Sequence, residues 1–137
     1  KQGGFSIVLP DHVPEPSGGV VVPFFGIKTL TSTLASKLAS KTKCALVGLS
    51  CIRRDDGRGF DIYCYKLDDP ALYDRNAETA AYALNLAMQR MIEDNYSHYM
   101  WGYRRFKLIP TINNPYSVDD ADLAALIRTY HASVDSK

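Results

Sequence analysis

Two neighbouring arginines late in the chain, Arg104 and Arg105, are the most evident candidates for binding chemistry. They lie in residues 101–107, Trp-Gly-Tyr-Arg-Arg-Phe-Lys, where cations lie among aromatic rings. Guanidinium groups bind phosphate through paired hydrogen bonds, and together with aromatic rings they also stack on nucleic-acid bases. A third interpretation is structural: the cations end a helix favourably and the tryptophan packs on the core. The residues alone leave these three interpretations open. Between phosphate binding and a structural role we favour the structural one, because adjacent side chains on a regular backbone point in different directions and both arginines cannot easily reach one ligand.

Asp11 and His12 form a second candidate pair, directly after an apolar run over Phe5–Leu9 that we interpret as a strand. On an extended backbone the two side chains point to opposite faces, so we do not expect an Asp–His dyad. α/β folds commonly place site residues in the crevice beyond a strand end, so one interpretation of the pair is a binding role. The alternative is that Asp11 caps a turn.

A third candidate is the apolar segment Pro23, Phe24, Phe25 and Gly26, which follows the short β-branched run Val20–Val22. Two phenylalanines beside a strand are most often part of the core. The other interpretation is a hydrophobic wall for a long acyl chain, because ligand pockets are lined mainly by aromatic and aliphatic groups. These residues alone do not decide between the two.

Several classes of site are not indicated. The chain has no glycine-rich phosphate loop before a helix and no cluster of metal ligands, so we expect no cofactor and no metal. The net charge of +1 argues against nucleic acid as a partner. The three cysteines, Cys44, Cys51 and Cys64, lack paired spacing and lie in apolar runs, which predicts buried thiols. No apolar run reaches the length of a bilayer span, and the start of the chain indicates a piece cut from a longer protein that is soluble by itself.

The elements that would position these residues can be read from periodicity. Leu30, Leu34 and Leu38 repeat at helical spacing after a possible cap at Thr29 or Thr31. Alternating apolar residues over 45–51 and 60–64 flank Asp56-Gly57, which favours a β-hairpin. Asp74 or Asn76 can cap a long helix through Ile92, and Ser117–Asp120 can cap a last helix with Leu123, Leu126, Ile127, Tyr130 and Val134 on its apolar face. Together these patterns predict an α/β fold, a mixed β-sheet with flanking helices, in one domain over residues 1–137.

Five segments resemble the late acyltransferases of lipid A biosynthesis, within the wider glycerolipid acyltransferase group. They are Pro10–His12, Val20–Gly26, Thr31–Thr33 with Leu38-Ala39, Arg53 with Asp56-Gly57, and Tyr99–Lys107. The match covers about residues 4–110, and residues 111–137 form a C-terminal extension with a helix. The resemblance implies the C-terminal part of an incomplete acyltransferase domain.

Such enzymes transfer a fatty acyl chain from acyl carrier protein to a hydroxyl of a phosphorylated disaccharide lipid, at the cytoplasmic face of the inner membrane. The resemblance implies a general base in a His-x4-Asp/Glu motif, and none of the three histidines is followed by an acidic residue at that spacing. We therefore expect the catalytic motif, and an N-terminal membrane anchor, upstream of Lys1. The chain by itself would be inactive.

The resemblance also assigns roles to the candidate residues. Asp11, with His12 beside it, would help to position the acceptor, Pro23–Gly26 would shape the acyl site, and Arg104 and Arg105 would support the fold or bind phosphate. The family usually has His where Tyr103 stands and Pro-Glu-Gln where Tyr96–His98 stands. These departures argue against a catalytic part for the closing motif, and the alternative function is a non-catalytic module that binds lipid or phosphate.

Overall fold

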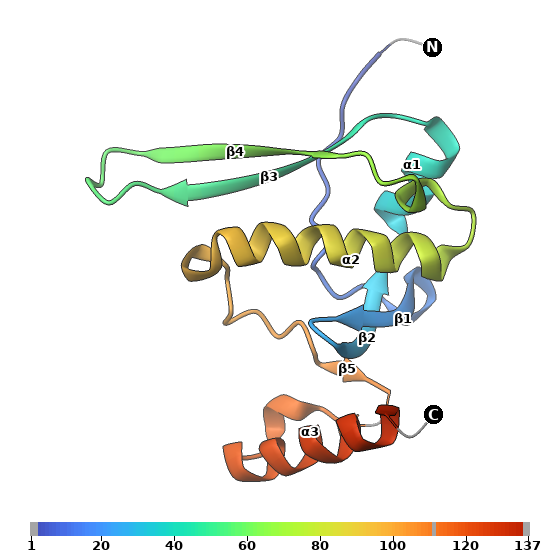
Figure 1. The fold of residues 1–137 in the computed structure, drawn as a ribbon, viewed down its shortest axis with the longest axis vertical. Coiled ribbons are helices and arrows are strands. Elements are labelled where there is room, and N and C mark those ends of the chain that lie inside the picture. Colours follow the sequence, from blue (N-terminus) through green and yellow to red (C-terminus); the bar gives the residue numbers. More distant parts are fainter. Residues whose placement is uncertain (1–2, 111, 136–137) are drawn as a thin grey trace.

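The structure is a computed structural model that describes residues 3–110 and 112–135. Within these residues, helices alternate with pairs of short strands (Figure 1). The elements are β1 (Gly19–Phe24), β2 (Ile27–Ser32), α1 (Leu34–Thr42), β3 (Leu46–Arg53), β4 (Phe60–Leu67), α2 (Ala77–Asp94), β5 (Leu108–Ile109), β6 (Ile112–Asn113) and α3 (Asp120–Asp135). Single 3-10 turns cover Pro16–Gly18, Pro70–Tyr73, Tyr96–His98 and Pro115–Ser117.

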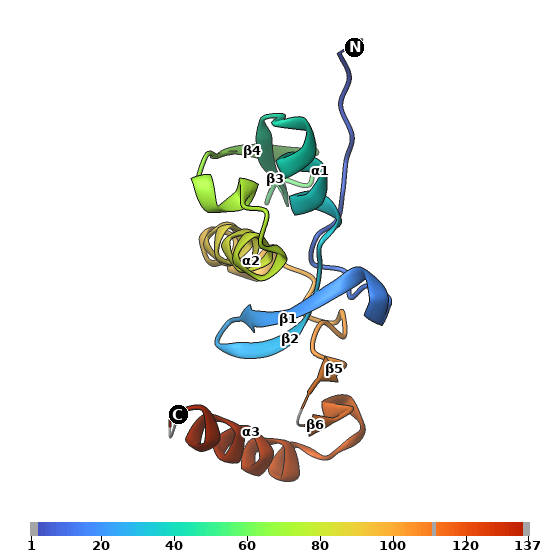
Figure 2. The same cartoon turned by 90° about the vertical axis from the view of Figure 1, so that its right-hand side faces the viewer.

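The long helix α2 lies between two hairpins. The β3–β4 hairpin runs along one side of α2 and extends beyond its end, and the β1–β2 hairpin packs on the other side (Figures 1 and 2). β5 continues past β2, and α3 forms the last layer at the opposite end of the molecule from β3–β4. The predicted combination of helices and strands is confirmed, but the strands of the described residues form three separate antiparallel pairs instead of one mixed sheet.

Helix α2 follows the prediction closely. Asn76 is its N-cap, and the side-chain oxygen accepts hydrogen bonds from the backbone N–H groups of Glu78 and Thr79 at 2.9 and 3.0 Å. This satisfies two donors that have no partner within the helix. The face that packs on the hairpins is buried at Ala80, Ala81, Ala83, Leu84, Asn85, Met88 and Ile92. The cap and the apolar stripe together explain why a helix forms here and where it begins.

The β1–β2 hairpin corrects the predicted start of the preceding helix. Thr29 and Thr31, expected as possible helix caps, lie in β2 with fully buried side chains, and Leu30 lies between them. The helix α1 starts only at Leu34, and its N-cap Thr33 makes no side-chain capping bond. Leu30 shares helical spacing with Leu34 and Leu38, but pairing with β1 decides its conformation, because Val21 lies opposite it. Tertiary pairing here overrides a local periodic pattern.

The β3–β4 hairpin is confirmed, with its inner face against α2. A Cβ added at Gly48 would lie 2.5 Å from Sδ of Met91, so the absence of a side chain allows β3 to approach the helix this closely. Cross-strand partners Leu49–Cys64 and Cys51–Ile62 lie on the outer face.

That outer face is apolar and exposed, and it corrects the prediction for the cysteines. Leu49 and Ile62 are 58% and 66% exposed, and all three cysteines are free and exposed. The alternating pattern was interpreted correctly as a strand, but nothing among the described residues covers the side on which Cys51 and Cys64 lie. The thiols are therefore accessible.

Two further expectations concern the ends of the chain. The predicted strand over Phe5–Leu9 is wrong: the segment is irregular, and Phe5, Ile7 and Leu9 are exposed, because no segment within residues 3–110 and 112–135 pairs with this backbone. The last helix is confirmed as α3, where the Asp119 side chain accepts the backbone N–H of Asp122 at 2.9 Å. Its predicted face contributes buried Tyr130, whereas the side chain of Val134 lies outside the described residues.

Among residues 3–110 and 112–135, no helix is both long and apolar enough to cross a membrane.

Candidate functional site

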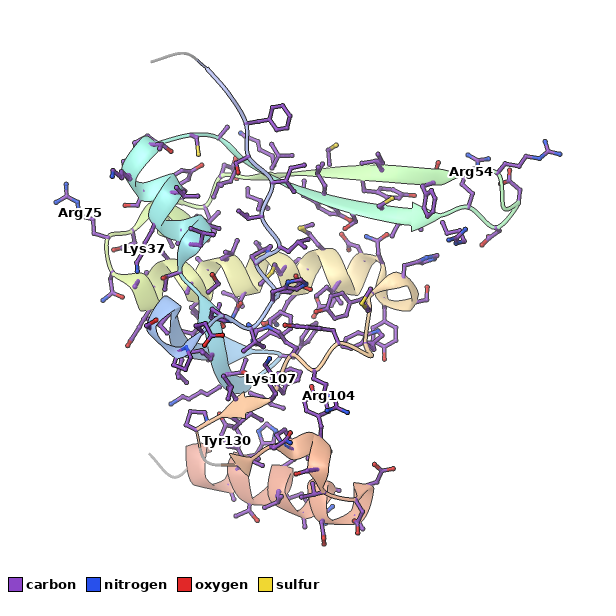
Figure 3. All side chains as sticks on the ribbon, turned by 180° about the vertical axis from the view of Figure 1, so that it is seen from behind. Lys37, Arg54, Arg75, Arg104, Lys107 and Tyr130 are labelled. Atoms are coloured by element: carbon purple, nitrogen blue, oxygen red, sulfur yellow. The ribbon has the colours of Figure 1, made fainter. Side chains whose placement is uncertain are left out.

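Three segments that lie far apart in the sequence meet around the end of the β1–β2 hairpin. They are the turn at Pro10–Val13, the hairpin end at Pro23–Gly26 and the closing segment at Tyr99–Lys107. Each contains residues selected above from the sequence. Figure 3 shows the closing segment, marked by Arg104 and Lys107, on the far side of the hairpin from Arg75 and Lys37.

The hairpin end separates its two phenylalanines. Phe24 is the last residue of β1 and is 1% exposed in a cluster with Met88 and Ile92, as the core interpretation requires. Phe25 and Gly26 form the two-residue turn, and both have positive φ, 47° and 76°, as a type I′ turn demands. The Phe25 ring is partly exposed, 6.0 Å between centroids from Trp101. Phe24 therefore belongs to the core, and Phe25 is partly exposed at the surface of the site.

Two polar side chains of α2 form hydrogen bonds with this end of the hairpin. The backbone N–H of Phe25 donates to Oε1 of Gln89 at 3.0 Å. Fully buried Asn85 donates through Nδ2 to the carbonyl of Pro23 at 2.7 Å and to Oγ1 of Thr31 at 3.1 Å. Phe24 and Ile27 close the hairpin, so Pro23 and Lys28 form the next, non-hydrogen-bonded pair, and the carbonyl of Pro23 is free to take this bond.

Arg105 fastens the closing segment to β2. Its side chain is 2% exposed, and it donates from Nη1 to the carbonyl of Leu30 and from Nη2 to Oγ1 of Thr31, both at 2.8 Å. The guanidinium carbon also lies 5.0 Å from the centre of the Phe24 ring, which is close enough for a cation–π contact. Burial lowers the pKa of the Arg105 guanidinium, and the neighbouring Tyr99 and Asp11 oppose that shift. The guanidinium group of Arg105 thus donates to groups inside the protein, as a structural role requires.

Arg104 has the opposite surroundings. Its side chain is exposed, and its guanidinium carbon lies 5.9 Å from the centre of the Tyr116 ring. The two arginines therefore point to different places, as expected for neighbours on the chain. Of the pair, Arg104 is the one whose position allows contact with a phosphate from solution.

Asp11 and His12 each contact a tyrosine of the closing segment. Tyr99 donates its hydroxyl to Oδ2 of partly buried Asp11 at 3.2 Å. Burial, together with the negative charge of Asp11, raises the pKa of the Tyr99 hydroxyl above its ordinary range. The exposed His12 ring stacks on Tyr103, with 5.0 Å between centroids. Asp11 thus lies in a turn and not at a strand end, because residues 5–9 form no strand.

Tyr103 links the same two segments through the backbone. Its hydroxyl accepts the N–H of Val13 at 2.8 Å, on the same side chain that stacks against His12. A phenol in this position fastens the N-terminal turn to the closing segment. Its contacts are those of a structural residue.

Sequence reasoning missed Asn85 and Gln89, although one signal pointed to the first. Asn85 follows Ala81 by four residues and precedes Met88 by three, so a polar side chain interrupts the apolar stripe of α2. A polar residue at a buried position needs partners, which here are Pro23 and Thr31. Gln89 lies beside the stripe and carried no such signal.

The arrangement is suited to binding. It presents an exposed guanidinium, a partly exposed carboxylate held by a tyrosine, and an aromatic ring at a turn, which suit a phosphate, a hydroxyl and a hydrocarbon respectively. Among the described residues, no group of three or more His, Cys, Asp or Glu could hold a metal ion.

Comparisons with known proteins agree on one family. The family model described as bacterial lipid A biosynthesis acyltransferase matches residues 1–108. A lipid A biosynthesis lauroyltransferase of Escherichia coli is 32% identical over 112 residues, which make up 80% of this chain and 36% of that protein. A lipid A biosynthesis acyltransferase of Haemophilus influenzae is 30% identical over 109 residues, 77% of this chain and 34% of that protein. The chain thus spans about a third of the length of these curated relatives.

Proposed function

Because the chain belongs to the bacterial lipid A biosynthesis acyltransferase family, we propose that it forms the C-terminal part of an enzyme of lipopolysaccharide synthesis. The enzyme transfers a fatty acyl chain from acyl carrier protein to a hydroxyl of a phosphorylated disaccharide lipid. The observation that carries this proposal is the convergence of three segments, at residues 10–13, 23–26 and 99–107, all within the matched residues 1–108.

Each converging segment suits one part of that acceptor and donor. Oδ2 of Asp11 takes the Tyr99 hydroxyl, and a carboxylate has further lone pairs that can accept a hydrogen bond from an acceptor hydroxyl. The Phe25 ring, partly exposed at its turn, can contact the acyl chain. The exposed Arg104 can bind a lipid phosphate, while Arg105 keeps the segment in place from inside.

The general base belongs to the part of the enzyme that this chain does not span. We propose a histidine with an acidic residue five positions later, because imidazole can remove the proton of the acceptor hydroxyl as it attacks the thioester, and a carboxylate orients the ring. Asp11 in this scheme is a positioning residue. It holds the acceptor and does not take the proton.

The remainder of the enzyme would also complete the fold and anchor it at the cytoplasmic face of the inner membrane. The exposed apolar face of β3–β4, with Leu49 and Ile62 outward, supports an incomplete glycerolipid-acyltransferase-like domain, since an apolar sheet face of this kind is normally covered.

The test uses the full-length enzyme and follows transfer from acyl carrier protein to the lipid acceptor. Asp11→Asn keeps an oxygen that can accept the Tyr99 hydroxyl but removes the charge, so we expect kcat to fall by about tenfold or more with an unchanged melting temperature. Asp55→Asn, at the exposed tip of the β3–β4 hairpin, is the matched control.

Two results would count against the proposal. Absence of any transfer by the unmodified full-length enzyme would contradict the function itself. Wild-type turnover in Asp11→Asn would remove Asp11 from the acceptor site and leave it as a residue of the turn.

A further inference from the structure

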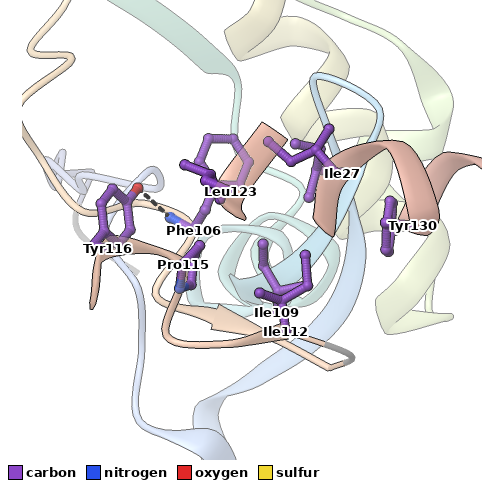
Figure 4. A pocket seen from close by; sticks show the side chains of 9 residues that line it. Ile27, Phe106, Ile109, Ile112, Pro115, Tyr116, Leu123 and Tyr130 are labelled. Atoms are coloured by element: carbon purple, nitrogen blue, oxygen red, sulfur yellow. Dashed lines mark hydrogen bonds between the residues drawn. The ribbon is translucent and has the colours of Figure 1, made fainter. Parts of the chain in front are cut away.

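A small cavity lies beneath α3, largely beyond the residues that match the family. Its volume is about 100 Å³, and only apolar atoms line it (Figure 4). The walls come from Ile27 at the start of β2, from Phe106 of the closing segment, from the β5–β6 pair and from one face of α3. The family model ends at residue 108, so most of these walls belong to the C-terminal extension.

The cavity has a buried floor and an accessible rim. Ile109, Ile112 and Tyr130 are 6–8% exposed and form the floor. Leu123 and Tyr116 at the rim are partly exposed to solvent. A molecule can therefore enter from the side on which α3 begins.

The two tyrosines contribute rings, and their hydroxyls have partners in the backbone. The Tyr116 hydroxyl accepts the N–H of Phe106 at 3.0 Å, and the Tyr130 hydroxyl accepts the N–H of Lys28 at 2.8 Å. A water inside would need two to four polar partners, and an apolar lining offers none. Apolar cavities of this kind stay dry and bind apolar groups, as an engineered cavity of about 150 Å³ binds benzene.

The rim carries a cation beside the apolar opening. The guanidinium carbon of Arg104 lies 5.9 Å from the centre of the Tyr116 ring, and exposed Lys107 follows Phe106. Of the acidic residues at the start of α3, Asp119 accepts the N–H of Asp122 through its side chain, whereas Asp120 and Asp122 are exposed in the first turn. An oxyanion at the rim would meet the fork of Arg104.

We propose that this cavity binds the end of an alkyl chain whose oxyanion head, a carboxylate or a phosphate, lies at Arg104. The ligand is an anionic single-chain lipid, bound at a site distinct from the turn at Phe25. The site goes beyond the proposed acyl transfer. It shares Arg104 with the phosphate contact proposed above, but its apolar walls lie apart from the turn at Phe25, and binding requires only the cavity and the cation.

The first experiment needs no substitution. The chain is labelled with ¹³C at the isoleucine δ1 methyl groups and titrated with decanoate below its micelle concentration. We expect chemical-shift changes at Ile109, Ile112 and Ile127, which line the cavity, and none at Ile62 on the outer face of β4. Changes confined to Ile62, or no changes at all, would overturn the proposal.

The second experiment fills the cavity. Ile127→Trp places an indole into the space, and we expect the affinity for decanoate to fall at least tenfold by calorimetry. Leu126→Trp, the neighbouring exposed position on α3 that does not line the cavity, is the control and should bind as the parent does. Equal losses in the two variants, with both folded by circular dichroism, would refute a specific cavity site.

The third experiment tests the head group. Arg104→Gln should weaken decanoate and decyl phosphate several-fold and leave decanol unchanged, whereas Arg75→Gln, near the start of α2, should change none of them (Figure 3). Higher affinity for decanoate identifies the ligand as a fatty acid, and higher affinity for decyl phosphate identifies it as a lipid with a phosphate head. Equal binding of decanol and the anions to the unmodified chain would remove Arg104 from the site and contradict the anionic head.

Discussion

Replacement of Arg105 by lysine tests whether the closing segment is held from inside. The guanidinium donates to Leu30 and to Thr31 at 2.8 Å each, from a side chain that is 2% exposed. A single ammonium keeps the charge, but it cannot reproduce the planar fork that reaches both acceptors. At least one charge-assisted hydrogen bond is lost, worth about 1.5–3 kcal/mol. We therefore expect Arg105→Lys to lower the free energy of unfolding by about 2–3 kcal/mol.

Thermal and urea denaturation of the purified chain measure this loss. For a domain of this size, 1 kcal/mol corresponds to about 3–5 °C, so the melting temperature should fall by about 6–15 °C. The slope of the free energy of unfolding against urea concentration should stay the same if only stability changes. Arg104→Lys is the matched control, because the exposed side chain of Arg104 should change stability by less than about 0.5 kcal/mol.

Two outcomes would refute this account of Arg105. Unchanged melting in Arg105→Lys would mean that the fork does not stabilise the fold. Unchanged melting together with weaker lipid binding by the full-length enzyme, in both arginine variants, would instead assign both residues to phosphate.

Three further predictions follow from other parts of the structure. Asn76→Ala removes the cap of α2 and should lower the free energy of unfolding in urea by about 1 kcal/mol, with Glu15→Ala as the control, because Glu15 is an exposed cap residue with ordinary φ that makes no side-chain cap bond. Because the pKa of Tyr99 is raised, the folded state keeps a proton that the unfolded state loses above about pH 10, and the free energy of unfolding falls as the pH rises past that value. Urea titrations between about pH 10 and pH 11 should show a smaller decrease in the free energy of unfolding for Tyr99→Phe than for the parent chain. The 137-residue chain itself should transfer no acyl group from acyl carrier protein in a radiolabel assay, because no histidine has an acidic residue five positions later, and measurable transfer would contradict the proposed general base.

The elements that could be predicted from the sequence are those with local determinants. Asn76 and the apolar stripe of α2 lie within one helix, and the Asp56-Gly57 turn with its flanking alternation lies within one hairpin. The conformation of both elements is determined by residues that are close together in the sequence. The segments 5–9 and 29–32 were mistaken for the opposite reason, because the presence or absence of a partner strand elsewhere decides whether a strand forms.

The candidate site could be predicted as a set of segments but not as a geometry. Arg105 and Leu30 are 75 positions apart, and no periodicity links them. The resemblance assigned the two arginines to support of the fold or to phosphate binding without separating them, whereas folding buries Arg105 and leaves Arg104 exposed. Only the backbone path after α2 decides which of two neighbours points inward.

The backbone conformation of Phe25 is strained for any residue that has a side chain. A φ of 47° is a conformation that glycine or asparagine adopts readily, whereas for other residues it costs about 1–3 kcal/mol. A mutation that relaxes the turn would make the hairpin more stable and, in the same step, remove the ring that lies against Trp101. Selection for thermal stability alone would thus favour replacement of Phe25, and a stabilised enzyme obtained in this way would lose the ring that we propose for contact with the acyl chain.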